Sequence, residues 1–255
     1  MSVIVKHHPK VYFTFGRFQP PTIGHRILID TMSKIAHEEN ADAYVFVSSK
    51  QNDMEQYRKS KAYKEMKTTN TFWSTDLNEN PLSVGEKVEF LRLMYPDTPT
   101  VFVDTTLEGC TQLFHIIDTL RSVGYTDITM AVGSDRLPTF QRTLRGSSIK
   151  VISLGERTVN SENMSVKAMS GTKMRLAAIK PDLDAFMRGT MIGNMTEEDV
   201  MRLMNMIRVS LDYTPYTRGG SKRKNSRRNQ CVNIKTRRRG TYKLREYEKF
   251  DCKHM

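Results

Sequence analysis

Five short segments rich in β-branched and aromatic residues recur along the chain, with helix-like intervals between them. They cover residues 11–15, 43–48, 100–104, 128–132 and 149–154. Each segment is a nearly continuous apolar run and not an alternating one, which is typical of strands that are covered on both faces. The pattern therefore predicts a parallel sheet with helices packed against both sides.

The intervals between these segments carry apolar residues at helical spacing. The pattern predicts helices at 24–36, 84–94 and 112–123, each with its apolar residues along one side. Strand and helix thus alternate, which favours right-handed crossovers and an open, five-stranded, Rossmann-like α/β sheet. In such sheets a ligand binds beyond the carboxyl ends of the strands, near the point where the strand order reverses.

The remaining segments lack this alternation. The stretch 49–82 is polar, contains Trp73 and is interpreted as a long loop or an inserted helix beside the site. A last helix is predicted at about 196–209, because Thr196 and Asp199 have capping-box spacing ahead of an apolar stripe. Residues 211–255 are too polar to bury a core, so we expect a globular part at 1–210 and a flexible tail.

The net charge of +12 lies almost entirely in that tail. Residues 211–255 hold 14 Lys and Arg and 4 Asp and Glu, a balance of +10, which leaves +2 for residues 1–210. Five aromatic residues are interleaved with the basic ones, so the tail could bind RNA or DNA, although a solvated tail has the same composition. We expect removal of everything after Ser210 to leave the fold and nucleotide binding intact.

Several classes of protein are disfavoured by the sequence. No apolar run approaches the roughly 18 residues of a membrane span, and the first residues lack the apolar core of an export signal. Three scattered cysteines indicate a reducing, cytoplasmic setting. The sequence contains no Walker A, GxGxxG or GxSxG motif, and Cys231, Cys252 and His254 lack the spacing of a zinc site, so no protein metal site is predicted.

Residues 15–25, FGRFQPPTIGH, connect the first predicted strand to the first predicted helix. The amide groups and positive dipole end at a helix N-terminus form an anion site. Gly16 and Gly24 permit close approach of a phosphate to the backbone. Thr22 and His25 lie three positions apart, so we expect both side chains to face the same phosphate, although the spacing alone also fits an ordinary helix cap.

A second polar segment, MSGTKMR at 169–175, follows about 145 residues later. Ser170 and Thr172 suit the start of a helix, and Arg175 lies one turn further on. The two hydroxyls and the guanidinium can therefore converge on a polyphosphate.

Taken together, the two segments resemble the two signatures of the nucleotidylyltransferase superfamily, the (H/T)xGH or cytidylyltransferase-like enzymes. TIGH at 22–25 is similar to the first signature. Residues 169–175 are similar to the second, roughly ISxTxxR, which binds the β- and γ-phosphates of the nucleotide; Gly171 departs mildly from it. The lead-in GRFQP resembles the nicotinamide-nucleotide adenylyltransferase branch, whereas Thr22 replaces the usual histidine, as in pantetheine-phosphate adenylyltransferases.

The resemblance covers about residues 10–180. AVGSDRL at 131–137 is similar to a GxD element that contacts the nucleotide in this superfamily, although Asp135 could equally cap a helix. In the helix before the third strand, the family commonly has a basic residue near Lys87. The whole chain also resembles nucleotidylyltransferase-like proteins of large bacteriophages, which would place it in the host cytoplasm.

The resemblance implies transfer of AMP or CMP from a nucleoside triphosphate to a phosphorylated acceptor, with release of pyrophosphate. Mg²⁺ would be held mainly by the phosphates of ATP or CTP. The catalytic residues implied are Thr22, His25 and Arg175. The nucleotide-binding residues implied are Gly16, Arg17, Phe18, Gln19, Gly24, Gly133, Asp135, Ser170 and Thr172.

The acceptor is left open by the sequence. GRFQP favours a mononucleotide such as nicotinamide mononucleotide, Thr22 favours phosphopantetheine, and an alcohol phosphate used with CTP is a third choice. The alternative function is a protein of the same fold with reduced catalysis, which binds nucleic acid or associates with virions through the basic tail.

Overall fold

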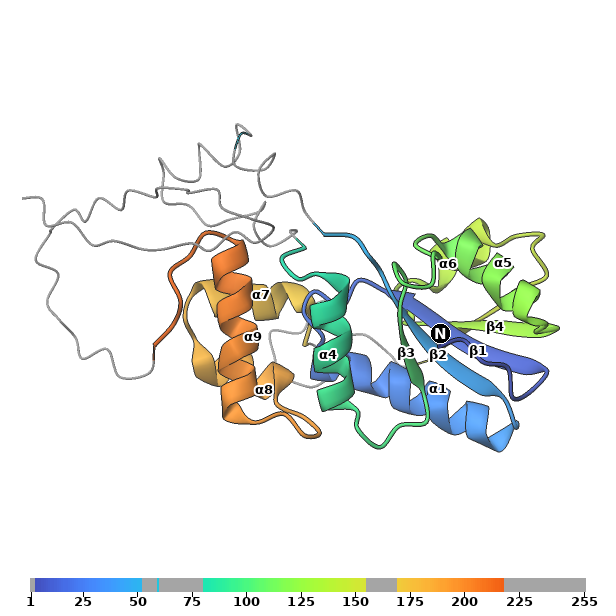
Figure 1. Ribbon diagram of the computed structural model, residues 1–255, viewed down its shortest axis with the longest axis horizontal. Coiled ribbons are helices and arrows are strands. Elements are labelled where there is room, and N and C mark those ends of the chain that lie inside the picture. Colours follow the sequence, from blue (N-terminus) through green and yellow to red (C-terminus); the bar gives the residue numbers. More distant parts are fainter. Residues whose placement is uncertain (1–2, 52–58, 60–79, 155–168, 218–255) are drawn as a thin grey trace, which may run out of the picture. The chain divides into compact units, whose positions relative to one another are not determined.

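A computed structural model describes residues 3–51, 59, 80–154 and 169–217 of the chain. Five strands form one parallel sheet in the order β3-β2-β1-β4-β5 (Figure 1). They are β1 (Lys10–Gly16), β2 (Asp42–Val47), β3 (Val101–Asp104), β4 (Asp127–Val132) and β5 (Lys150–Ser153). Each predicted strand is confirmed to within one residue at either end, as is the predicted Rossmann-like sheet.

Helices cover both faces of this sheet, as predicted. The helices α1 (Arg26–Glu38) and α4 (Val84–Met94) share one apolar cluster with the face that carries Val45. The helices α5 (Leu113–Val123) and α6 (Leu137–Thr143) share the other cluster with the face that carries Phe46 (Figure 1). Consecutive strand residues point to opposite faces, so the continuous apolar runs supply both cores.

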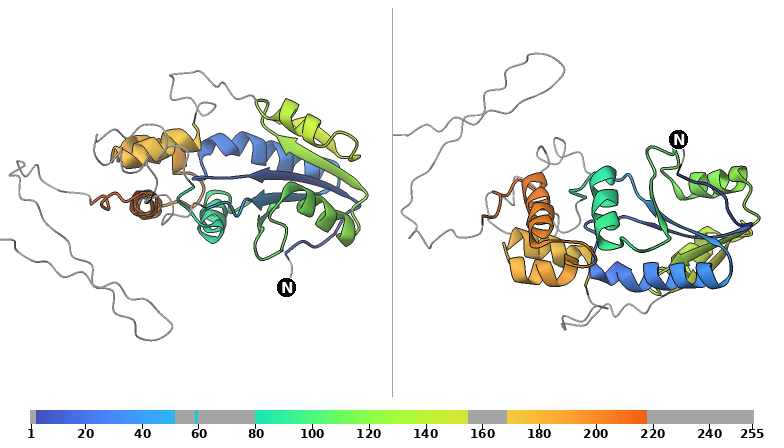
Figure 2. Two further views of the ribbon diagram at one scale, coloured as in Figure 1. Left: turned by 90° about the horizontal axis from the view of Figure 1, so that it is seen from above. Right: turned by 60° about the horizontal axis from the view of Figure 1, so that its bottom comes forward.

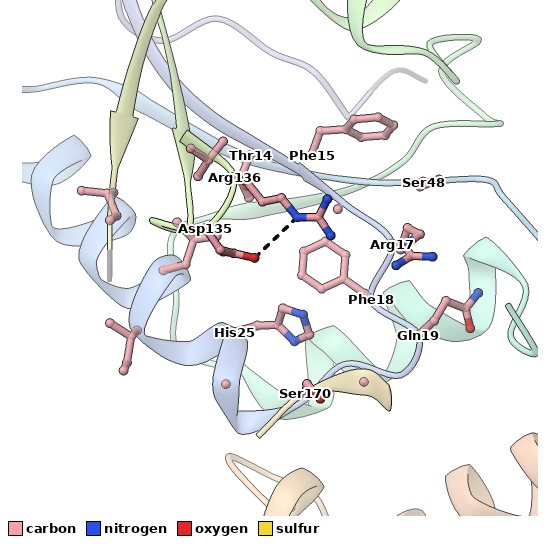
Figure 3. A pocket seen from close by; sticks show the side chains of 18 of the residues that line it. Thr14, Phe15, Arg17, Phe18, Gln19, His25, Ser48, Asp135, Arg136 and Ser170 are labelled. Carbon is pink, nitrogen blue, oxygen red and sulfur yellow. Dashed lines mark ion pairs between the residues drawn. The ribbon is translucent and has the colours of Figure 1, made fainter. Parts of the chain in front are cut away.

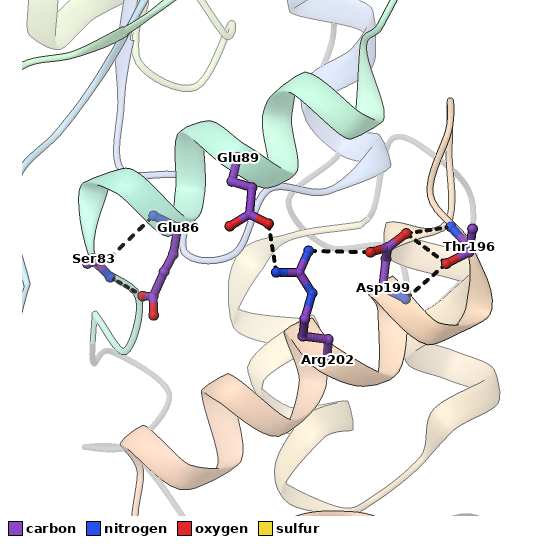
Figure 4. Close-up of polar contacts among 6 residues, drawn as sticks. All are labelled: Ser83, Glu86, Glu89, Thr196, Asp199 and Arg202. Carbon is purple, nitrogen blue, oxygen red and sulfur yellow. Dashed lines mark hydrogen bonds and ion pairs between the residues drawn. The ribbon is translucent and has the colours of Figure 1, made fainter. Parts of the chain in front are cut away.

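Three further helices extend the apolar cluster of α1 and α4. They are α7 (Gly171–Ile179), α8 (Leu183–Thr190) and α9 (Glu197–Ser210). The predicted capping box of α9 is confirmed, because the Asp199 amide donates to Thr196 Oγ1 over 3.1 Å and the Thr196 amide donates to Asp199 Oδ2 over 3.1 Å. Figure 4 shows how Arg202 of α9 pairs with Glu89 of α4 at 2.7 Å, an exposed link that adds little stability.

Residues 211–216, which begin the expected tail, pack on α9. The Asn205 side chain donates to Tyr216 O over 3.0 Å and accepts from the Tyr216 amide over 2.5 Å. Arg208, itself buried, donates to Thr214 O over 2.7 Å and to the carbonyl of Ile179 at the end of α7 over 3.0 Å. Residues up to Tyr216 thus belong to the compact unit, and all 14 basic residues counted in the tail lie beyond it.

These contacts change the expectation for a truncated chain. A chain that ends at Ser210 should lose about 3 kcal/mol of unfolding free energy relative to one that ends at Thr217. The shorter chain lacks the side chain of Leu211, which is only 1% exposed. It also lacks the Thr214 carbonyl that accepts a hydrogen bond from Arg208. Urea denaturation of the two truncated chains and the full chain measures this difference. Equal midpoints and slopes for the two shorter chains would contradict it.

Most of the predicted segment 49–82 and the tail beyond Thr217 lie outside the described residues. The helices that the structure describes include none that is both long enough and apolar enough to cross a membrane.

Candidate active site

A cavity of about 450 Å³ opens at the carboxyl ends of the strands. It lies where the chain leaves β1 and β4, the two neighbouring strands from which the crossovers run in opposite directions. This is the switch point at which parallel α/β sheets bind ligands. The first turn of α1 and the N-terminus of α7 complete its wall (Figure 3).

The cavity brings together eleven of the twelve residues that the sequence analysis selected. They are Gly16, Arg17, Phe18, Gln19, Gly24, His25, Gly133, Asp135, Ser170, Thr172 and Arg175. The exception is Thr22, which is fully buried and does not line the cavity. The roles assigned to these residues stay predictions, but their convergence from three parts of the sequence is a property of the fold.

His25 is held in one orientation by its neighbours. The Thr22 amide donates to His25 Nδ1 over 3.0 Å, and Thr22 Oγ1 lies 3.1 Å from the same nitrogen. An Nδ1 that accepts from an amide carries no proton, so the proton of the neutral ring is on Nε2. The Phe18 ring packs on the imidazole at 4.8 Å between centroids. Thr22 therefore contacts the imidazole of His25 and does not line the cavity.

Two glycines allow the two signature segments to pack against each other. A Cβ added to Gly24 would lie 2.0 Å from the carbonyl oxygen of Met169, and one added to Gly171 would lie 2.6 Å from that of Gln19. Both distances are far below van der Waals contact, so any larger residue would force the two backbones apart. Main-chain contact thus fixes the position of α7 relative to the turn after β1.

The N-terminus of α7 forms one wall of the cavity. Ser170 caps the helix by accepting from the Lys173 amide over 3.3 Å. Arg175, one turn later, is 4% exposed and donates to Gln19 O and, over 3.3 Å, to Thr172 Oγ1. These bonds hold the guanidinium at the helix end whose dipole favours negative charge, a site suited to phosphate oxygens.

Gln19 lines the cavity, yet its side chain is bonded elsewhere. Its Nε2 donates to Leu82 O over 2.6 Å, and its Oε1 accepts from the Leu82 amide over 3.0 Å. Both partners are buried, so this clamp joins the turn after β1 to the segment that precedes α4. A nucleotide contact of Gln19, as predicted, would be made by its backbone, or else its side chain would give up the two hydrogen bonds to Leu82.

The β4 side of the cavity contains residues that sequence reasoning missed. Arg136 and Phe140 line it beside the predicted Asp135, and Ser48 lines the opposite side after β2. Arg136 Nε lies 3.5 Å from Asp135 Oδ2 (Figure 3). A signal for Arg136 was available, because it follows directly on Asp135; Ser48 and Phe140 carried none.

Lys87, the basic residue noted in the helix before the third strand, does not line the cavity. It is fully buried and donates from Nζ to the carbonyl of Ser48 over 2.5 Å. Burial lowers the pKa of Lys87 to about 8, against the opposing effect of Asp104 and Glu86. Lys87 therefore supports the side of the cavity that Ser48 lines.

The lowered pKa of Lys87 predicts a pH dependence of stability. Between about pH 8 and 10.5 the unfolded chain binds this proton and the folded chain does not, so stability rises with pH across that window. Relative to a Lys87→Met variant, the unfolding free energy of the natural chain should increase by about 1 kcal/mol from pH 7 to pH 9. Urea denaturation of both proteins at the two pH values measures it; a constant difference would contradict the burial argument.

Comparison with known proteins yields matches among solved structures alone, since no family model and no curated protein matches the chain. Nicotinic acid mononucleotide adenylyltransferase from Plasmodium falciparum, solved in complex with NaAD, has a TM-score of 0.50 and 12% identity over 78% of this chain and 98% of its own. A candidate nicotinate-nucleotide adenylyltransferase from Vibrio parahaemolyticus has a TM-score of 0.42 and 13% identity over 68% of this chain and 88% of its own. At 12% identity the likeness to the Plasmodium enzyme concerns the fold, and in its fold this chain is similar to a nucleotidylyltransferase.

Proposed function

We propose that the protein is a nucleotidyltransferase that moves AMP from ATP to a mononucleotide acceptor and releases pyrophosphate. The observation that carries the proposal is the junction of the two signature segments, in which His25 and Arg175 line one cavity although 150 residues separate them in the sequence. A generic anion-binding turn would not require the second segment at all.

In the proposed reaction the acceptor phosphate attacks the α-phosphorus of ATP in line. A new P–O bond forms as the bond from the α-phosphorus to the β-phosphate bridging oxygen breaks, and the electron pair leaves with pyrophosphate. No protein nucleophile is needed, so catalysis consists of positioning and charge stabilisation. The Nε2–H of His25 is suited to donate to an oxygen on which charge develops.

The departing pyrophosphate would lie at the N-terminus of α7. Ser170, Thr172 and Arg175 supply hydroxyls and a cation at that point, and the helix dipole adds to the attraction. Arg17 lines the cavity after β1 and would contact phosphate oxygens of the acceptor or of the triphosphate.

The donor set of the cavity fits Mg²⁺ held by substrate. Among the described lining residues Asp135 supplies the one carboxylate, and the described part of the chain has no cluster of three or more His, Cys, Asp or Glu that could bind a metal. Mg²⁺ takes one or two carboxylates together with phosphate oxygens and water. When bound, the ion would neutralise phosphate charge, and Asp135 would reach it directly or through water.

The structure of the Plasmodium enzyme contains NaAD, a product of adenylyl transfer to nicotinate mononucleotide. This supports a pyridine mononucleotide as the first acceptor to test, in agreement with the GRFQP segment. Phosphopantetheine and alcohol phosphates are the other choices that the sequence leaves open.

The test is pyrophosphate release by the full chain with Mg²⁺, with ATP or CTP paired in turn with each acceptor. We expect release with ATP and nicotinate or nicotinamide mononucleotide. No release in any combination would contradict the proposal and turn attention to the alternative, a fold retained for nucleic-acid binding. Comparing RNA and DNA binding by the full chain and by residues 1–217, at two salt concentrations, tests that alternative separately.

A further inference from the structure

The charged side chains that line the cavity differ in how strongly the protein fixes their positions. Among the described residues that line it, Arg17, Arg136 and Arg175 supply three guanidinium groups and Asp135 supplies the one carboxylate. Arg175 is almost fully buried and hydrogen-bonded to protein oxygens. The Arg136 side chain is 59% exposed and its contact with Asp135 measures 3.5 Å, a weak interaction for an exposed pair.

The backbone of Arg136, in contrast, is fixed. Its amide donates to Gly133 O over 2.9 Å, and its carbonyl accepts from the Phe140 amide over 3.1 Å as α6 begins. The side chain points into the cavity that Asp135, Arg17 and His25 also line (Figure 3). A fixed backbone with a weakly paired guanidinium suits a residue whose side chain changes its partner when a ligand binds.

Both substrates of the proposed reaction bring negative charge into this space. A triphosphate and a phosphate monoester repel each other, and their reacting atoms must approach to about 3–3.5 Å. Phosphate oxygens can accept two parallel hydrogen bonds from a guanidinium. The Asp135 carboxylate does not pair with Arg136 in this way, since the contact between them is one of 3.5 Å. The ligand can therefore compete with Asp135 for Arg136.

We propose that Arg136 is a phosphate-binding residue, which exchanges the Asp135 carboxylate for oxygens of the triphosphate when the nucleotide binds. The inference rests on the proposed function in that it takes the ligand to be a nucleoside triphosphate. It adds a contact from the β4 side of the cavity to those from the turn after β1 and from α7.

Calorimetric binding of Mg²⁺-ATP, Mg²⁺-CTP and adenosine to the full chain tests the proposal without requiring turnover. An Arg136→Met variant should bind the preferred triphosphate about tenfold more weakly, the scale of one charge-assisted contact, and should bind adenosine as the natural chain does. Arg136→Lys should recover part of the loss, and 0.5 M salt should reduce the difference. The matched control is Arg142→Met, since Arg142 is an exposed residue of α6, the helix that begins directly after Arg136, and does not line the cavity.

The outcomes separate this inference from the proposed function. Unchanged triphosphate affinity in Arg136→Met would overturn the inference alone, as would an equal loss for adenosine, which would place Arg136 against the nucleoside or in the fold. A natural chain that binds ATP but releases no pyrophosphate would count against the transferase and leave the inference standing. A natural chain that binds neither triphosphate would overturn both.

Discussion

Replacing His25 by alanine should lower kcat of pyrophosphate release by about 10² to 10³, the usual scale for loss of one donor to developing charge. The expectation rests on the fixed tautomer, because the Thr22 amide occupies Nδ1 and leaves the ring proton on Nε2. Steady-state kinetics with saturating ATP and the preferred acceptor measure the effect.

The matched control for this variant is His37→Ala. His37 lies in α1, the helix that begins directly after His25; it is exposed and does not line the cavity, so its removal should leave kcat within about twofold. An unchanged kcat in His25→Ala would remove the imidazole from the mechanism, whereas an equal fall in both variants would indicate damage to α1.

Replacing Gly24 by alanine should destabilise the fold by about 3 kcal/mol and abolish tight nucleotide binding. The new Cβ would lie 2.0 Å from the carbonyl oxygen of Met169, and relief of that clash must separate the turn after β1 from the start of α7. Because Ser170 directly follows Met169, the shift displaces the N-terminus of α7 in the cavity wall, where we propose that phosphate binds. Urea denaturation and ATP calorimetry measure the two effects.

Gly85→Ala provides the comparison for this variant. Gly85 lies in the first turn of α4, and a Cβ added to it meets nothing within 4 Å. This variant should be slightly more stable than the natural chain, by up to about 1 kcal/mol, because alanine is the better helix former. A Gly24→Ala variant as stable as Gly85→Ala would show that the close backbone contact is not maintained in solution.

The strands of the sheet were predictable because the signal for each lies within a short stretch of sequence. A parallel strand covered on both faces needs a continuous apolar run, and each of the five runs became a strand. The helices α6 and α8 were not predicted, since each has only seven or eight residues. Such short segments hold too few turns to display a helical period.

The site was predictable in composition but not in geometry. Spacing placed Thr22 and His25 on one side of a helix, whereas Thr22 precedes the helical turn with extended backbone angles of φ −146° and ψ 162°. Its side chain therefore turns inward to the imidazole. Ser48 lines the cavity because β2 ends beside β1, a neighbourhood that follows from the order of the strands and that the sequence does not display.

The contact between Gly24 and Met169 also bears on how this protein can change over evolutionary time. A side chain can be exchanged where a pocket tolerates it, but a carbonyl oxygen occupies the place of a missing Cβ in every descendant that keeps the junction. In distant relatives that conserve it, Gly24 should persist even where Thr22 and the flanking residues have diverged. The length of the chain between the two segments, in contrast, is free to drift.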